Sequence, residues 1–143
     1  LYAVGGQNYD DGWLSSVERY DPATNAWEEV APMAVERNLA GVAVLDGKLY
    51  AVGGHGGGHL SSVERYDPGR DAWEAVAPLT LARFGAGVAA LDGKLYAVGG
   101  RVEEEDEDAV DSNTVERFDP ATNAWEEVAP MATARAFAVA LLM

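Results

Sequence analysis

The chain repeats itself three times, and this repetition constrains its fold more than any other feature. The hexapeptide LYAVGG begins at Leu1, Leu49 and Leu95. A second block, VERYDP, occurs twice and returns a third time with Phe118 in place of Tyr. The segments between these blocks keep their lengths, except for the stretch after the double Gly, which holds ten, eight and fourteen residues. A fixed frame with one variable loop indicates a repeated supersecondary unit whose loop diverges freely.

Each unit is predicted to form four short strands. Residues 41–45 and 87–91 are small and apolar, and each stretch precedes Asp-Gly, which is the strongest short hairpin signal. The LYAV strand is apolar on both faces, and the Gly-Gly after it permits a positive φ or a close backbone approach. The VERY and WEEV stretches alternate apolar and charged residues, as half-buried strands do. Four antiparallel strands in a unit of 46 to 52 residues are typical of a β-propeller blade.

The same landmarks resemble the kelch repeat, whose signature is a double Gly, a Tyr, and a Trp seven positions later. This resemblance implies an all-β fold of kelch β-propeller blades, most often six to a ring, and protein binding as the usual role. We expect the aromatic pairs to fill the space between neighbouring blades. The signature positions are Gly5, Gly6, Tyr20 and Trp27, then Gly53, Gly54, Tyr66 and Trp73, then Gly99, Gly100, Phe118 and Trp125.

We expect a single domain over residues 1–143, with blade units at about 1–34, 35–80 and 81–132. Residues 135–143 align with residues 37–45, so they are expected to supply the strand that completes the first blade. Three blades cannot close into a ring, and an open arc would expose unpaired strand edges. The sequence therefore predicts a half-propeller whose homodimer closes a six-bladed ring by twofold symmetry. The alternative is a piece of a longer propeller.

One Arg recurs in every link between blades, at Arg37, Arg83 and Arg135. Two roles are open for these side chains. They could donate hydrogen bonds to backbone carbonyls between blades, or they could form a ring of guanidinium groups at the channel mouth, suited to acidic peptides. The kelch resemblance implies that these links and the variable loops form the ligand-facing end of the propeller.

The residues after each of these arginines favour an apolar ligand, or none. Some kelch adaptors carry further basic and polar residues there, whereas this chain has Asn38-Leu39, Phe84-Gly85 and Ala136-Phe137. In the variable loops, Tyr9 and Trp13 have no aromatic counterpart in the other units, and an exposed Trp suits a binding hot spot. The candidate ligand-facing residues are Gln7, Trp13, Arg37, Asn38, His55, Arg83, Phe84, Arg101, Arg135 and Phe137.

The variable loops carry weak signals for a metal. His55 and His59 are four residues apart, but three intervening Gly argue against a helix, and no third ligand is evident. The acidic run 103–108 lacks the alternating ligands and central Gly of a calcium loop. We expect a solvated loop there; the alternatives are a weak divalent-cation site or an attraction for a basic partner. No metal site is predicted.

The composition excludes several function classes. Ten Lys and Arg against 24 Asp and Glu, a net charge of −14, argue against nucleic acid and against an anionic membrane surface. No apolar run is long enough to span a bilayer. The lack of Cys removes disulfides, thiolate metal sites and cysteine nucleophiles. With no signal peptide visible either, a cytoplasmic protein is expected.

No catalytic motif is found, so no catalytic residue and no cofactor are predicted. The predicted function is a non-enzymatic protein- or peptide-binding scaffold. Residues 17–34 and 115–132 differ only at Tyr20 and Phe118, which favours as an alternative an engineered or recently duplicated ring with no selected ligand. A carbohydrate-active propeller is a further alternative, suggested only by aromatic and acidic residues near the channel.

Overall fold

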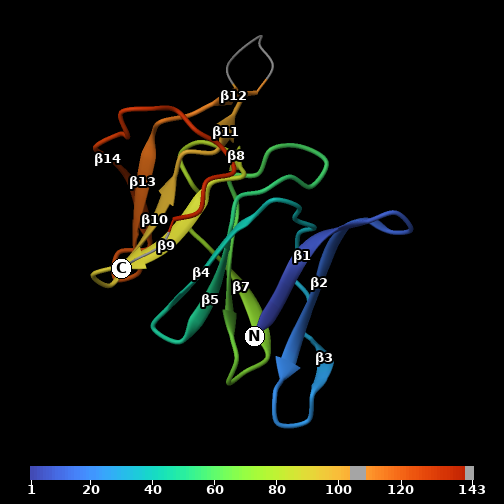
Figure 1. The fold of residues 1–143 in the computed structure, drawn as a ribbon. Helices are drawn as coiled ribbons and strands as arrows, with labels where there is room; N and C mark the ends of the chain where they lie inside the picture. Colours follow the sequence, from blue (N-terminus) through green and yellow to red (C-terminus); the bar gives the residue numbers. More distant parts are fainter. Residues whose placement is uncertain (104–108, 141–143) are drawn as a thin grey trace.

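The computed structural model describes residues 1–103 and 109–140. Every regular element in these ranges is a β-strand, which confirms the all-β prediction. Within the same ranges there is no helix that could span a membrane. The strands form blades that stand side by side in an arc, with the N-terminal and C-terminal units at opposite ends of it (Figure 1).

The second and third blades are four-stranded antiparallel sheets, as predicted for kelch β-propeller units. In each blade the strands follow one another across the sheet in chain order. The second blade consists of β4 (Gly41–Leu45), β5 (Lys48–Val52), β6 (Val63–Asp67) and β7 (Ala72–Val76). The third consists of β9 (Gly87–Leu91), β10 (Lys94–Val98), β13 (Val115–Asp119) and β14 (Ala124–Val128).

The first blade has three strands, β1 (Tyr2–Asn8), β2 (Gly12–Asp21) and β3 (Ala26–Val30). In the described part of the chain, nothing stands where β4 and β9 stand in the other two blades. A separate small sheet joins β8 (Arg83–Phe84), β11 (Arg101–Val102) and β12 (Val110–Asp111). Because the first blade has no fourth strand in the described part of the chain, the edge of β1 that faces the arc's interior is open.

The predicted turn chemistry is present in both complete blades. Asp46 and Gly47 between β4 and β5 have φ values of 49° and 72°, and Asp92 and Gly93 repeat this pair. Two consecutive positive φ values are those of a type I′ turn, whose twist matches the flanking strands. The Asp-Gly signal thus predicted both hairpins correctly.

The double Gly admits a close backbone contact. At Gly53 φ is 61°, and a Cβ would overlap the carbonyl oxygen of Arg83. The next residue, Gly54, donates its N–H to the same carbonyl at 2.9 Å. The other two units repeat the contact with their own Arg. The predicted positive φ and close approach are both found, and together they dock each outgoing link onto its blade.

The core lies between the blades. Its larger cluster joins the second and third blades, where Tyr50 is 2% exposed and Phe118 is 1% exposed. The indole N–H of Trp73 donates to the carbonyl of Ala31 in the link before its blade, at 2.8 Å, and Trp125 repeats this contact with the preceding link. In the first blade, by contrast, Trp27 is 47% exposed, because no blade precedes it in this chain.

Residues 135–140 form no strand in the single chain, and residues 141–143 lie outside the described part, so the strand expected at 135–143 stays a prediction. The stretch 138–140 runs beside β9 and, with β4 and β9, lines an open groove of about 520 Å³. A strand needs a free edge for its hydrogen bonds. The matching edge belongs to β1, at the opposite end of the arc (Figure 1).

Candidate functional site

The variable loops gather at one end of the blades. The β1–β2 hairpin, the loop after β5, and strands β11 and β12 all lie toward the upper side of the arc (Figure 1). A short β-bridge between Asn38 and His55 ties the loop after β5 to the link between blades, and a second bridge joins His55 to His59 within that loop. In the third unit the small sheet of β8, β11 and β12 does the same. Loops and links therefore share one surface, as the kelch resemblance implies.

Five rings on this surface form a continuous series, which we call the aromatic row. Trp13 and His55 have ring centroids 5.1 Å apart, and His55 and His59 5.5 Å. His59 lies 4.7 Å from Phe84, which lies 6.1 Å from Phe137. The row connects all three units. Phe137, at one end, is 59% exposed, and Trp13, at the other, is 36% exposed.

Polar groups flank the aromatic row. The Nδ2 of Asn38 donates to the Oε1 of Gln7 at 2.9 Å. The guanidinium of Arg101 lies 6.0 Å from the centroid of the Phe84 ring, within cation–π range. The structure thus brings seven of the ten predicted ligand-facing residues together: Gln7, Trp13, Asn38, His55, Phe84, Arg101 and Phe137.

Strained backbone presents two bulky side chains at this end. Leu39 and Phe137 have φ values of 53° and 55°, in a region that costs a bulky residue roughly 1–2 kcal/mol. The same position in the link between them is Gly85, with φ 62°. Leu39 and Phe137 are nonetheless largely exposed. Strained backbone of this kind clusters at ligand clamps and other functional sites.

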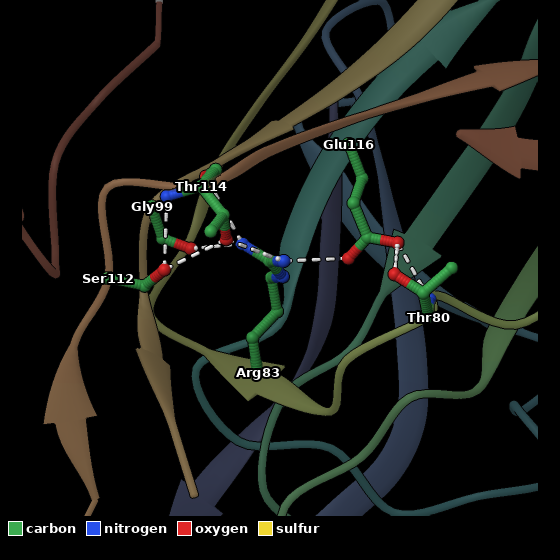
Figure 2. A network of polar contacts seen from close by, with 6 residues as sticks. All are labelled: Thr80, Arg83, Gly99, Ser112, Thr114 and Glu116. Atoms are coloured by element: carbon green, nitrogen blue, oxygen red, sulfur yellow. Dashed lines mark hydrogen bonds and ion pairs between the residues drawn. The ribbon is translucent and has the colours of Figure 1, made fainter. Parts of the chain in front are cut away.

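The two arginines Arg37 and Arg83 are placed differently from the ligand-face prediction. Arg83 is 1% exposed, and its Nη1 donates to the carbonyl of Gly99 at 2.8 Å (Figure 2). Its Nη2 donates to Glu116 at 2.6 Å and to Thr114 at 3.1 Å. Glu116 in turn accepts the N–H of Thr80 at 2.6 Å. Every one of these acceptors belongs to the next blade or to the link leading to it.

Arg37 makes the equivalent contacts one joint earlier. It donates to the carbonyls of Gly53 and Ser62, each at 2.8 Å, and its Nη2 lies 2.9 Å from Glu64. A buried guanidinium needs such a carboxylate partner, since an uncompensated charge there is costly. This placement corrects the prediction that Arg37 and Arg83 face a ligand. It matches the other role considered for them, hydrogen bonding between blades.

Arg135 differs from its two counterparts. Its backbone docks on the double Gly of its own unit, where Gly100 donates to its carbonyl at 2.9 Å. Its side chain is exposed and has no hydrogen bond or ion pair with any described residue. It also lies apart from the contacts that make up the aromatic row.

Several structural and surface residues escaped the sequence analysis. The sequence analysis expected VERY to form a half-buried strand and gave its Glu no role, whereas Glu64 and Glu116 are buried between blades. The available signal was an Arg and a Glu that recur at the same repeat positions, at Arg37, Arg83 and Arg135 and at Glu18, Glu64 and Glu116. His59 was considered only as a metal ligand, but its ring belongs to the aromatic row. The described ranges hold no group of three potential metal ligands, and most of the acidic run, residues 104–108, falls outside them.

Parts of the chain are similar to known proteins. The chain is 50% identical over 60 residues to Kelch-like ECH-associated protein 1B of Danio rerio, covering 40% of this chain and 10% of that protein. It is 45% identical over 56 residues to Kelch-like protein 33 of Homo sapiens, covering 38% and 10%. With Kelch-like protein 1 of Mus musculus the identity is 48% over 50 residues, covering 35% and 7%. The matched stretch thus spans a tenth or less of these relatives.

A family model is matched over nearly the whole chain. The model described as "Kelch motif" matches residues 1–34, 36–80 and 82–132. These boundaries separate the same three units that the blades and the repeated glycines define. The chain belongs to the kelch-motif family.

Proposed function

We propose that the chain is part of a non-enzymatic propeller scaffold that binds a protein or peptide at the aromatic row. The continuous series of rings from Trp13 to Phe137 carries this proposal. Aromatic side chains dominate binding hot spots, because each buries a large apolar area at a low cost in conformational entropy. The name of the relative Kelch-like ECH-associated protein 1B also speaks of an association for that protein.

The ligand is expected to insert apolar or aromatic anchor side chains. With Arg37 and Arg83 buried in ion pairs, no ring of guanidinium groups supports recognition of an acidic segment. The amides of Gln7 and Asn38 and the guanidinium of Arg101 supply a polar rim around the rings. An apolar centre with a polar rim is the usual make-up of a specific interface.

Selection from a random peptide library against the immobilised chain tests this function. Enriched peptides should lose at least about tenfold in affinity, roughly 1.4 kcal/mol, with Trp13→Ala and with Phe137→Ala. The matched control is Tyr9→Ala, because Tyr9 is a fully exposed aromatic on the same hairpin and lies outside the row. The control should bind like the wild type.

Two results would contradict the proposed binding site. One is a library that yields no peptide enriched over a chain carrying both alanine variants. The other is a set of enriched peptides that bind the wild type and both variants equally well. Either result would favour the alternative of a self-assembling ring without a selected ligand.

We further infer that two chains close one six-bladed ring. The open edge of β1 supports this, since the first blade has three strands where the others have four. Two chains would form a ring of six blades, which lies within the usual range of roughly four to eight. Three chains would form a ring of nine blades, which lies outside that range. Light scattering should give twice the chain mass of 15.2 kDa. A single mass of 15.2 kDa over a wide range of concentrations would refute the two-chain ring.

A further inference from the structure

The two joints inside the chain are each closed by a buried Arg–Glu pair. At each joint the Arg comes from a link docked on one blade, and the Glu from the second position of VERY in the next blade. The pairs are Arg37 with Glu64 at 2.9 Å and Arg83 with Glu116 at 2.6 Å (Figure 2). All four side chains are nearly inaccessible to solvent. The repeat contains one more Arg and one more Glu of this kind.

Those remaining members are Arg135 and Glu18. Both side chains are exposed, and neither has a hydrogen bond or ion pair with any residue that the structure describes. Arg135 is held at its backbone as Arg37 and Arg83 are, docked on its own double Gly. Glu18 lies in β2 at the register position of Glu64 in β6. The two halves of a third pair therefore lie at opposite ends of the arc.

We propose that Arg135 pairs with Glu18 of the partner subunit, so that two copies of this chain are joined by the same Arg–Glu pair that joins the blades within each. The inference rests on the proposed two-chain ring. Twofold symmetry makes the contact reciprocal, so that two identical joints form. Opposite charges at matching positions support this occupant of both faces.

The tryptophan contact at each joint supports the same pairing of faces. Trp73 donates its indole N–H to Ala31 in the preceding link, and the third blade repeats this contact. The first blade offers the same donor in Trp27, 47% exposed. The last link offers the matching carbonyl at Ala129, which is also exposed. A buried indole N–H usually finds an acceptor, and a second copy supplies one at the repeated position.

A series of backbone hydrogen bonds between successive links also lacks a partner at each of its two ends. Gly85 donates to the carbonyl of Leu39 at 2.9 Å, and Phe137 donates to the carbonyl of Gly85 at 2.7 Å. The N–H of Leu39 and the carbonyl of Phe137 have no partner among residues 1–103 and 109–140. In a ring of two chains each would meet the other across the joint. The strained φ of Leu39 and Phe137 is then explained by the series of hydrogen bonds that both continue.

The same face of the first blade exposes apolar side chains whose counterparts in the other blades are buried. Leu1 is 77% exposed, whereas Leu49 and Leu95, at the same repeat position, are 7% and 0% exposed. Tyr20 is likewise more exposed than its buried counterpart Tyr66. This blade therefore has the side chains of a joint, with Glu18 at the position that an Arg from another link would reach.

Charge reversal tests the pairing. Arg135→Glu and Glu18→Arg each place like charges at both joints, so each variant alone should weaken dimerisation at least about 100-fold by sedimentation equilibrium. In an equimolar mixture, one joint keeps the native pair and the other carries the swapped pair. The mixture should therefore recover most of the wild-type affinity. Because both side chains are exposed in the single chain, the substitutions remove no contact within it.

A matched control and a milder variant sharpen the result. Arg70→Glu makes the same charge change in an exposed turn of the second blade, away from both open faces, and should leave dimerisation unchanged. Glu18→Gln keeps the shape and removes the charge, so it should weaken the dimer less than Glu18→Arg. Recovery on mixing also identifies the pair if the single variants fail to fold.

The possible outcomes separate this pairing from the ring itself. A wild-type dimer whose affinity is unchanged by Arg135→Glu and Glu18→Arg, or whose variants do not recover on mixing, overturns the Arg135–Glu18 pair and leaves the ring intact. A wild type that stays monomeric at every concentration overturns both, and would leave the open faces to further blades of a longer chain.

Discussion

At the scale of single residues, the blade joints depend on a few polar atoms that two units share. The carboxylate of Asp71 accepts the N–H of Ala31 from the preceding link at 2.9 Å, and also the hydroxyl of Tyr66 at 2.8 Å. Burial, helped by the bond to Asp71, raises the pKa of Tyr66 to about 12. The hydrogen bonds from Ala31 and Tyr66 lower the pKa of Asp71. The carboxylate of Asp71 therefore links the joint between the first and second blades to the protonation state of the buried Tyr66 hydroxyl.

The pKa of Tyr66 predicts a loss of stability in alkali. Its folded pKa lies above the ordinary value of 10.0, so its contribution is complete below pH 10 and is lost as the pH rises toward about 12. Tyr66→Phe should cost about 1 kcal/mol of the free energy of unfolding at pH 7, from the lost hydrogen bond. It should also flatten the decline between about pH 10 and 12. Urea unfolding at pH 7 and across pH 9 to 12 measures both.

A second variant separates the two causes of the raised pKa. Asp71→Asn introduces the residue that occupies this position in the other two units, Asn25 and Asn123, and keeps the burial of Tyr66. With Asp71→Asn, the loss of the free energy of unfolding at alkaline pH should become smaller but should not disappear. An alkaline profile of Tyr66→Phe identical to that of the wild type would show that another group causes the loss.

At the scale of elements, the strands and turns were predictable wherever the residues that determine them lie close by in the sequence. Asp-Gly sets a two-residue turn through its own φ values, and the double Gly has positive φ values that let it approach the carbonyl of the Arg in the link after its blade. Both were read correctly from the residues alone. The expected strand at residues 135–143 depended on an edge elsewhere, and residues 135–140 form no strand beside β9.

The sequence identified many residues of the candidate site but not the contacts among their side chains. Divergence of the loops identified Trp13 and His55, and the departure from basic residues identified Phe84. Their contacts depend on how three blades are spaced, which no local pattern encodes. The buried Glu116 shows the same limit, because alternation tells which residues share a face and does not tell what covers that face. The only sequence signal for the buried Arg–Glu pairs was the recurrence of an Arg and a Glu at the same positions of the repeat.

At the scale of the whole molecule, the arc has matching ends. One end presents Trp27 and Glu18, and the other presents Ala129 and Arg135. Strands β4 and β9 and residues 138–140 line an open groove. Each internal joint contains a buried ion pair and an indole N–H that donates to the preceding link. Because the blades have little core of their own, their stability depends on the neighbours that cover them.

Dependence on neighbours predicts that thermal unfolding of the proposed two-chain ring varies with protein concentration. If two chains unfold together, a tenfold increase in concentration stabilises the dimer by about 1.4 kcal/mol. For two chains of 143 residues, the entropy of unfolding converts this into a rise of about 2 °C in Tm. Calorimetry over a 100-fold range should therefore show a rise of roughly 4–5 °C. A Tm that does not change over that range would mean that each chain unfolds independently, with its open faces uncovered.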